Sequence, residues 1–248
     1  MEKQALNTYQ VKMLQSIQKQ IKAYQNDFKP ERLHRMRLSV KKVKAIASLK
    51  FYISNKKQNY KELKPLYKAA GGIREIQILI KLVKSLTGFP KKISAALKSK
   101  EKEQQATFLK KLPKFQKQIH KFQDSLSSND SRVKTKWIVK YFEKQLQKAS
   151  AVFLLQKREE MHTFRKQIKN ILYVYLALPE KIQTRIPLNL TQLLKLQKKL
   201  GDWHDTYAAI YYLSKLKFHV SINTHVQKLK ILEKSQFKIL SGLPLIRN

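Results

Sequence analysis

Apolar residues recur at intervals of three and four positions along most of this chain, and this spacing constrains the fold more than any other feature. Two series show it most clearly: Leu33, Met36, Val40, Val43 and Ala47, and Met161, Phe164, Ile168, Ile171 and Tyr175. Each series places one apolar stripe on one face of a helix. Glycine, with 5 residues, and proline, with 7, are too scarce for the many turns of a β-sheet fold. The sequence therefore predicts an all-α protein.

Residues that usually interrupt helices stand at intervals along the chain. The predicted breaks are Pro30, Gly71–Gly72, Gly88–Pro90, 125–131, Pro179, Pro187, Gly201 and 217–223. The polar run 125–131 lies near the middle, so we predict two helical units, 1–125 and 132–248, joined there. The charge-rich stretch 98–111 is predicted to be a solvated helix, with a mobile hairpin arm as the alternative.

The net charge indicates the class of partner. The chain has 53 Lys and Arg residues against 16 Asp and Glu residues, a formal net charge of +37. Because self-repulsion at this level opposes compaction, a polyanionic partner is expected: nucleic acid, polyphosphate or an anionic membrane surface. Only nine of the 53 are Arg, the side chain suited to reading base edges. This ratio favours binding to phosphate without base readout.

Several function classes lack the residues they need. The chain has no cysteine, which excludes disulfides, thiolate chemistry and Cys-type zinc sites. Residues 1–20 lack the apolar core of a secretory signal, and the longest apolar stretch, 171–178, is too short to cross a membrane. No nucleophile–base pair, carboxylate cluster or phosphate-binding glycine loop is recognisable. We therefore expect a cytoplasmic, non-enzymatic protein without membrane insertion, metal or cofactor.

Two motifs recur in the same order in the two halves of the chain. Leu33 to Lys41 and Met161 to Lys169 each contain an apolar residue, a His, an Arg three positions on and a Lys four positions after the Arg. The two histidines, His34 and His162, are 128 positions apart. A second pair of motifs begins at Gly71 and Gly201, 130 positions apart. The sequence thus indicates a tandem duplication of one helical unit.

Helical geometry places the first motif beside the core. His34, Arg37, Lys41, Lys44 and Ser48 form one stripe, about 100° around the helix from the apolar stripe that begins at Leu33. His162, Arg165 and Lys169 repeat the arrangement. Basic stripes that border buried faces predict a positively charged groove or crevice between helices. The alternative interpretation is that they are ordinary solvated flanks of amphipathic helices.

At these residues the sequence resembles the CHAD family, an α-helical domain named for its conserved histidines. The family's His, Arg and following basic cluster correspond to His34, Arg37, Lys41, Lys42 and Lys44. In the second half His162, Arg165, Lys169 and Tyr173 correspond, whereas Asn170 and Leu172 stand where basic residues are usual. The family's Gly-x-x-Arg-Asp element corresponds to Gly71 to Glu75, with Glu75 in place of Asp. Leu200, Gly201 and Asp205 match its second-half counterpart.

The resemblance implies two four-helix bundles related by a pseudo-twofold axis, forming one domain around a basic central pore that binds inorganic polyphosphate. The implied ligand-binding residues are His34, Arg37, Lys41, Lys42, Lys44, Arg74, His162, Arg165, Lys166 and Lys169. Glu75, Asp205 and Tyr173 are expected to orient them. Because the second basic cluster is thinner, residues 34–44 are predicted to contribute more to binding than residues 162–173.

Polyphosphate offers only oxygens, so Lys, Arg and protonated His side chains are its natural hosts. We expect His34 and His162 to gain protons near it and binding to tighten below about pH 6.5. Polyphosphate granules are the expected location. A non-specific RNA- or other nucleic-acid-binding protein remains the alternative function. Trp137, Trp203 and the 11 Tyr residues raise the question of base stacking, but core packing is expected for most of them.

Overall fold

The computed structural model describes residues 2–55, 58, 60–86, 88–126, 134–214 and 219–243, and the regular elements within them are all helical. The predicted all-α class is therefore confirmed. The helices are α1 (Glu2–Asp27), α2 (Pro30–Ser54), the 3-10 helix η1 (Tyr60–Leu63), α3 (Lys64–Lys84), α4 (Lys91–Lys110), α5 (Leu112–Asp124), α6 (Thr135–Leu154), α7 (Arg158–Tyr175), α8 (Glu180–Gln183), α9 (Leu190–Ser214) and α10 (His219–Ser241).

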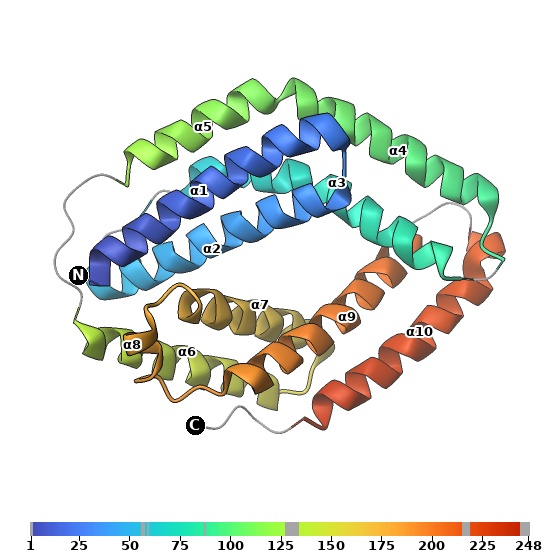
Figure 1. The fold of residues 1–248 in the computed structure, drawn as a ribbon. Coiled ribbons are helices and arrows are strands. Elements are labelled where there is room, and N and C mark those ends of the chain that lie inside the picture. Colours follow the sequence, from blue (N-terminus) through green and yellow to red (C-terminus); the bar gives the residue numbers. More distant parts are fainter. Residues whose placement is uncertain are drawn as a thin grey trace.

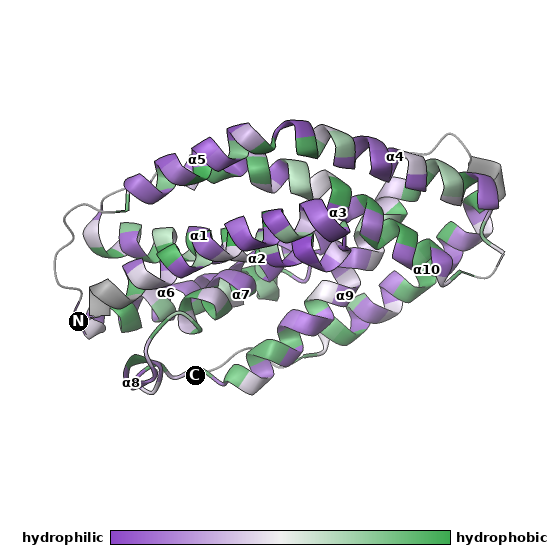
Figure 2. Cartoon of the chain, turned by 45° about the horizontal axis from the view of Figure 1, so that its top comes forward, coloured by the Kyte–Doolittle hydropathy of each residue, from purple (hydrophilic) through white to green (hydrophobic). Residues whose placement is uncertain are grey.

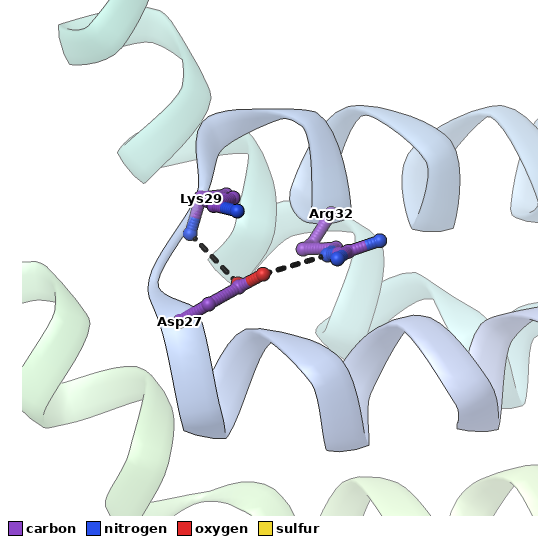
Figure 3. A network of polar contacts seen from close by, with 3 residues as sticks. All are labelled: Asp27, Lys29 and Arg32. Atoms are coloured by element: carbon purple, nitrogen blue, oxygen red, sulfur yellow. Dashed lines mark hydrogen bonds and ion pairs between the residues drawn. The ribbon is translucent and has the colours of Figure 1, made fainter.

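The turn from α1 to α2 shows why the predicted break at Pro30 is correct. Phe28 has a positive φ of 50°, which ends α1, and Pro30 occupies the first turn of α2, where its missing N–H is not needed. The Asp27 carboxylate accepts hydrogen bonds from the Lys29 backbone N–H and from Arg32 Nε, both at 3.0 Å (Figure 3). The Lys29 N–H, followed by the Arg32 side chain, lowers the pKa of Asp27.

Other predicted breaks have mixed outcomes. Gly88–Pro90 separates α3 from α4, and Pro179 and Pro187 flank the short α8. The predictions at Gly71–Gly72 and Gly201 are wrong, because these glycines lie inside α3 and α9. The stretch 98–111 is helical through Lys110, as the solvated-helix prediction states. Of two further predicted breaks, residues 127–131 and 217–218 lie outside the described residues, whereas the prediction is wrong for 219–223, which belong to α10.

The helices lie in an inner and an outer set. In Figure 1, α2 and α3 face α7 and α9 across the middle of the molecule, while α1, α4 and α5 lie outside on one side and α6 and α10 on the other. Contacts between α2 and α7 and between α3 and α9 join the two halves of the chain. The inner helices are those that carry the two basic motifs.

Three clusters of buried apolar side chains hold these helices together. One lies wholly in the first half, between α1, α2, α3, α4 and α5. A second joins Ala45, Ile46 and Leu49 of α2 to the core of α6, α7 and α9. The third joins the C-terminal part of α3 and the N-terminal part of α4 to α9 and α10. Figure 2 shows the matching alternation of apolar and polar residues along each helix. Two of these clusters contain residues from both 1–125 and 132–248. The division of the chain into these two units therefore stays a prediction.

One buried carboxylate ties three helices of the second half together. Glu233 of α10 accepts a hydrogen bond from Trp203 Nε1 of α9 at 2.7 Å and pairs with Arg158 Nε of α7 at 3.1 Å. Trp203 itself is fully buried, as expected for a core residue. Among the described residues, no helix has both the length and the hydropathy required to cross a bilayer.

Candidate anion-binding site

Five cationic side chains from three helices face one another at the centre of the fold. We call them the cation cluster: Arg37 and Lys41 of α2, Arg74 of α3, and Arg165 and Lys169 of α7. All five belong to the residues predicted from the sequence. They are neighbours because α2 packs directly against α7, so that the basic stripe of one helix meets that of the other.

The lysines of the cluster show how strongly these charges affect one another. Burial, followed by the charges of Lys169, Arg37 and Arg165, lowers the pKa of Lys41 to about 7. Burial and the charge of Arg165 lower the pKa of Lys169 to about 8. An exposed lysine has a pKa near 10.4, so the cluster has too little negative charge around it to keep both ammonium groups fully protonated.

Two carboxylates face the cluster from its edges within the described part of the chain. Asp205 of α9 lies near Arg165 and Arg74, and Glu31 lies near Arg74. Burial alone would raise the pKa of Asp205, but the contact with His204 and the charge of Arg165 lower it below its usual value. Asp205 is therefore ionised at neutral pH. Five cations against two carboxylates leave the cluster strongly positive.

The best-held member of the cluster is Arg37, which lies against α3. Its Nη1 donates a hydrogen bond to the Tyr67 carbonyl oxygen at 2.6 Å, and its guanidinium lies 4.1 Å from the centre of the Tyr67 ring. Gly71 makes room for it, because a Cβ there would lie 3.2 Å from Arg37 Cζ and closer still to Nη1. Sequence reasoning missed Tyr67, although positions 67, 71 and 74 share one face of a helix.

Tyr173 also borders the cluster, near Arg165 and Tyr67. Burial raises its pKa to about 12, with Arg165 acting in the opposite direction and Tyr67 in the same one. The phenol therefore stays protonated at physiological pH. A protonated phenol beside Arg165 can donate a hydrogen bond to an anion that Arg165 attracts.

Two donors of the cluster are unused. The Nε atoms of Arg74 and Arg165 are buried, and neither has a hydrogen-bond partner among the described residues. A buried donor without a partner costs about 1–3 kcal/mol. An anion whose oxygens reach these nitrogens would supply the missing acceptors and neutralise the cluster.

The two motif histidines lie beside the cluster but have low proton affinity. Burial and the charge of Arg74 lower the pKa of His34, and burial and the charge of Lys166 lower the pKa of His162 to about 4. His162 stacks on His204 of α9, with ring centres 4.8 Å apart and planes at 23°. Both motif histidines are thus neutral at pH 7 in the free protein, and the lysines are the groups that titrate near neutrality.

The remaining predicted residues lie around the cluster. Lys42 is half-buried, and burial lowers its pKa. Lys44 is exposed, with its ammonium 5.6 Å from the centre of the Tyr60 ring. Lys166 and Glu75 are exposed, one residue along their helices from Arg165 and Arg74. Lys42, Lys166 and Glu75 each follow a cluster member by one residue, which turns the helix by about 100°, so these three side chains point away from the line on which the cluster members face one another.

No group of three His, Cys, Asp or Glu side chains suitable for a metal ion occurs in the part of the chain that the structure describes. The chemistry available at the cluster is that of charged donors: guanidinium and ammonium groups, a phenol and two unused buried N–H groups. Such a set holds anionic oxygens.

Comparison with known proteins places this geometry in a family. Residues 11–214 match the family model of the CHAD domain. The crystal structure of the CHAD domain from the plant Ricinus communis has a similar fold, with a TM-score of 0.74 at 16% identity, over 100% of this chain and 94% of that one. PptA from Streptomyces chartreusis has a TM-score of 0.68 at 12% identity, over 96% of each chain. No curated protein sequence matches. Since the family model spans most of the chain, the protein belongs to the CHAD family.

Proposed function

We propose that this protein binds inorganic polyphosphate at the cation cluster. The observation that carries the proposal is the shortage of negative charge there. Five cations face two carboxylates, the pKa of Lys41 is lowered to about 7, and two arginine Nε donors are buried without partners. A chain of phosphates supplies the missing charge and the missing acceptors together.

The guanidinium and ammonium groups of the cluster both bind phosphate oxygens. The Arg37 guanidinium covers one face of the Tyr67 ring, so a base cannot stack on that face while Arg37 stays in place. This arrangement favours polyphosphate over nucleic acid at this position. The polyphosphate binding expected from the family resemblance supports the same ligand.

We further propose that the cluster lines a basic central pore and that the two halves are structural repeats. The contacts of α2 with α7 and of α3 with α9 support this, because they pair helices whose motifs correspond in the sequence. The proposed role is binding without hydrolysis, in the cytoplasm and at polyphosphate granules. Incubation with polyphosphate should then release no orthophosphate.

A charge-matched pair of variants tests the site. The first variant replaces Arg37, Lys41, Arg165 and Lys169 by Gln. The control replaces four exposed lysines of α4 by Gln: Lys91, Lys92, Lys98 and Lys102. Both variants lose four charges, so general electrostatic attraction falls equally. Binding of labelled long-chain polyphosphate is measured at about 150 mM salt, where weak polyanion binding is screened.

We expect the cluster variant to lose at least tenfold more affinity than the α4 control. Unlabelled polyphosphate should displace the label at lower phosphate concentration than single-stranded RNA or duplex DNA. Equal losses in the two variants would show that binding needs net charge alone, and displacement led by RNA or DNA would favour the nucleic-acid alternative at this site.

A further inference from the structure

The two tryptophans of the chain occupy opposite environments. Trp203 is fully buried, whereas Trp137, in the first turns of α6, is 42% exposed. Trp137 is thus an exception to the core packing expected for most of the aromatic residues. Figure 1 shows α6 at the periphery of the molecule, and none of the cation-cluster residues belongs to it. An exposed indole outside the candidate anion site calls for a separate explanation.

The Trp137 ring stands among lysines. The ammonium groups of Lys136 and Lys140 lie 5.6 Å and 5.4 Å from its centre. Two turns further along α6, the ammonium of Lys144 lies 5.5 Å from the centre of the Tyr52 ring of α2. Lysines of α6 therefore lie beside two aromatic rings, one on α6 itself and one on the neighbouring α2.

Lysines recur at every fourth position of this helix and form what we call the α6 lysine row: Lys136, Lys140, Lys144 and Lys148, all of them exposed. Like charges four positions apart destabilise a helix, and Glu143 is the exposed acidic residue of α6 that partly offsets them. The row spans about 18 Å, the length of about five phosphates of a stacked single strand. An extended polyanion can therefore follow it.

We propose that this face of α6 binds single-stranded nucleic acid, with phosphates on the lysine row and a base stacked on Trp137. Proteins that bind single strands without sequence preference combine these two elements, a basic track and aromatic platforms. The surface is distinct from the cation cluster, whose members lie on α2, α3 and α7.

The indole distinguishes nucleic acid from other polyanions. Polyphosphate has no π-face to stack on Trp137, and the bases of a duplex are already stacked on one another. An anionic membrane is the remaining competitor, but a membrane-surface helix needs an apolar face to bury in the lipid. Between Trp137 and Ala151 the exposed side chains of α6 are all polar or charged. The face therefore fits a polar strand better than lipid.

Tryptophan fluorescence tests the proposal directly, because the chain has 2 tryptophans and Trp203 is fully buried. The probe is a 12-nucleotide oligo(U) RNA. We expect it to quench the emission of Trp137, while polyphosphate of equal charge leaves that emission unchanged. Trp137→Ala should weaken RNA binding about 5- to 150-fold, the range for loss of one stacked base. Trp137→Phe should keep most of the RNA affinity, because phenylalanine still offers a ring for stacking.

Matched variants separate stacking from charge. Tyr211→Ala removes another exposed ring, on α9, and should leave RNA binding unchanged. Replacing Lys136, Lys140 and Lys144 by Gln should make the slope of log affinity against log salt shallower by about 2. Circular dichroism should show all variants folded, and the cation-cluster variant should keep its RNA binding.

Three results would overturn the proposal. RNA binding by Trp137→Ala equal to that of the unchanged protein would exclude stacking on this ring. Equal quenching by RNA and polyphosphate would show that only charge is sensed. A blue shift of Trp137 on phosphatidylserine vesicles, without quenching by RNA, would assign the face to membrane binding instead.

Discussion

The change Gly71→Ala tests whether α3 is shaped to hold Arg37. The Cβ would lie 3.2 Å from Arg37 Cζ and closer to Nη1, so the guanidinium would have to move. Moving it breaks the 2.6 Å hydrogen bond to the Tyr67 carbonyl and the contact with the Tyr67 ring. The backbone of α3 does not oppose the change, because alanine is the better helix former.

The expected effect on stability follows from these contributions. Alanine in place of glycine inside a helix stabilises by about 1 kcal/mol. Loss of a hydrogen bond from a charged group removes about 1.5 kcal/mol, and loss of an exposed cation–π contact removes about 0.5 kcal/mol. Gly71→Ala should therefore lower the free energy of unfolding by about 1 kcal/mol. Polyphosphate affinity should fall about tenfold, which corresponds to one displaced charged donor.

Gly201→Ala is the matched control. Gly201 lies inside α9, and nothing lies within 4 Å of the position of an added Cβ. The helix-propensity gain is therefore not offset, and the melting temperature should rise by about 2–4 °C without a change in affinity. Urea unfolding followed by circular dichroism, together with polyphosphate binding, measures both effects. If both glycine variants gain stability equally, or if Gly71→Ala keeps full affinity, the role assigned to Arg37 is wrong.

Further predictions concern the charges and the buried carboxylate. Lys41→Met should stabilise the free protein at pH 7 and weaken polyphosphate binding, as unfolding and titration experiments will measure. The pKa of Lys41 is about 7 when folded and 10.5 in its unperturbed state, so the unfolded chain binds more protons between these values. Stability should thus rise with pH from 7 to 9, more steeply than in Lys41→Met. Polyphosphate affinity should fall over that range as Lys41 and Lys169 deprotonate, and calorimetry in two buffers at pH 8 should detect proton uptake; a pH dependence confined below pH 6.5 would instead point to the histidines. Glu233→Ala should cost about 2–3 kcal/mol by leaving Trp203 Nε1 unpaired, against less than about 0.5 kcal/mol for the exposed Glu143→Ala, in urea unfolding.

The sequence pattern predicted helices well because their apolar spacing is local information. The positions of the prolines also marked helix ends correctly, since proline acts on its own backbone. The two glycine sites were mispredicted because a glycine inside a helix can be set by contacts with other helices, which the local sequence does not show. Gly71 is required by the side chain of Arg37, which comes from another helix, and no local pattern reveals that neighbour. Gly201 has no such neighbour, and nothing in the structure explains it.

The candidate site was predictable in part for the same reason. Arg37 and Lys41 are four positions apart, so helical spacing alone places them on one line. Lys42 matched the family pattern but turns away from that line, and helical geometry could have shown this. The low pKa of His162 depends on burial and on Lys166 and His204 together, which a motif cannot show.

The lowered lysine pKa values, the unpaired arginine donors and the excess of cations all reflect the same shortage of negative charge at the cluster. Each of them destabilises the free protein, and each is relieved by an anion. A charged or unpaired group that raises the free energy of the unbound protein contributes to affinity when the ligand removes that unfavourable interaction. Neutral substitutions of Lys41 and Lys169 should therefore yield a protein that is harder to unfold and binds polyphosphate poorly.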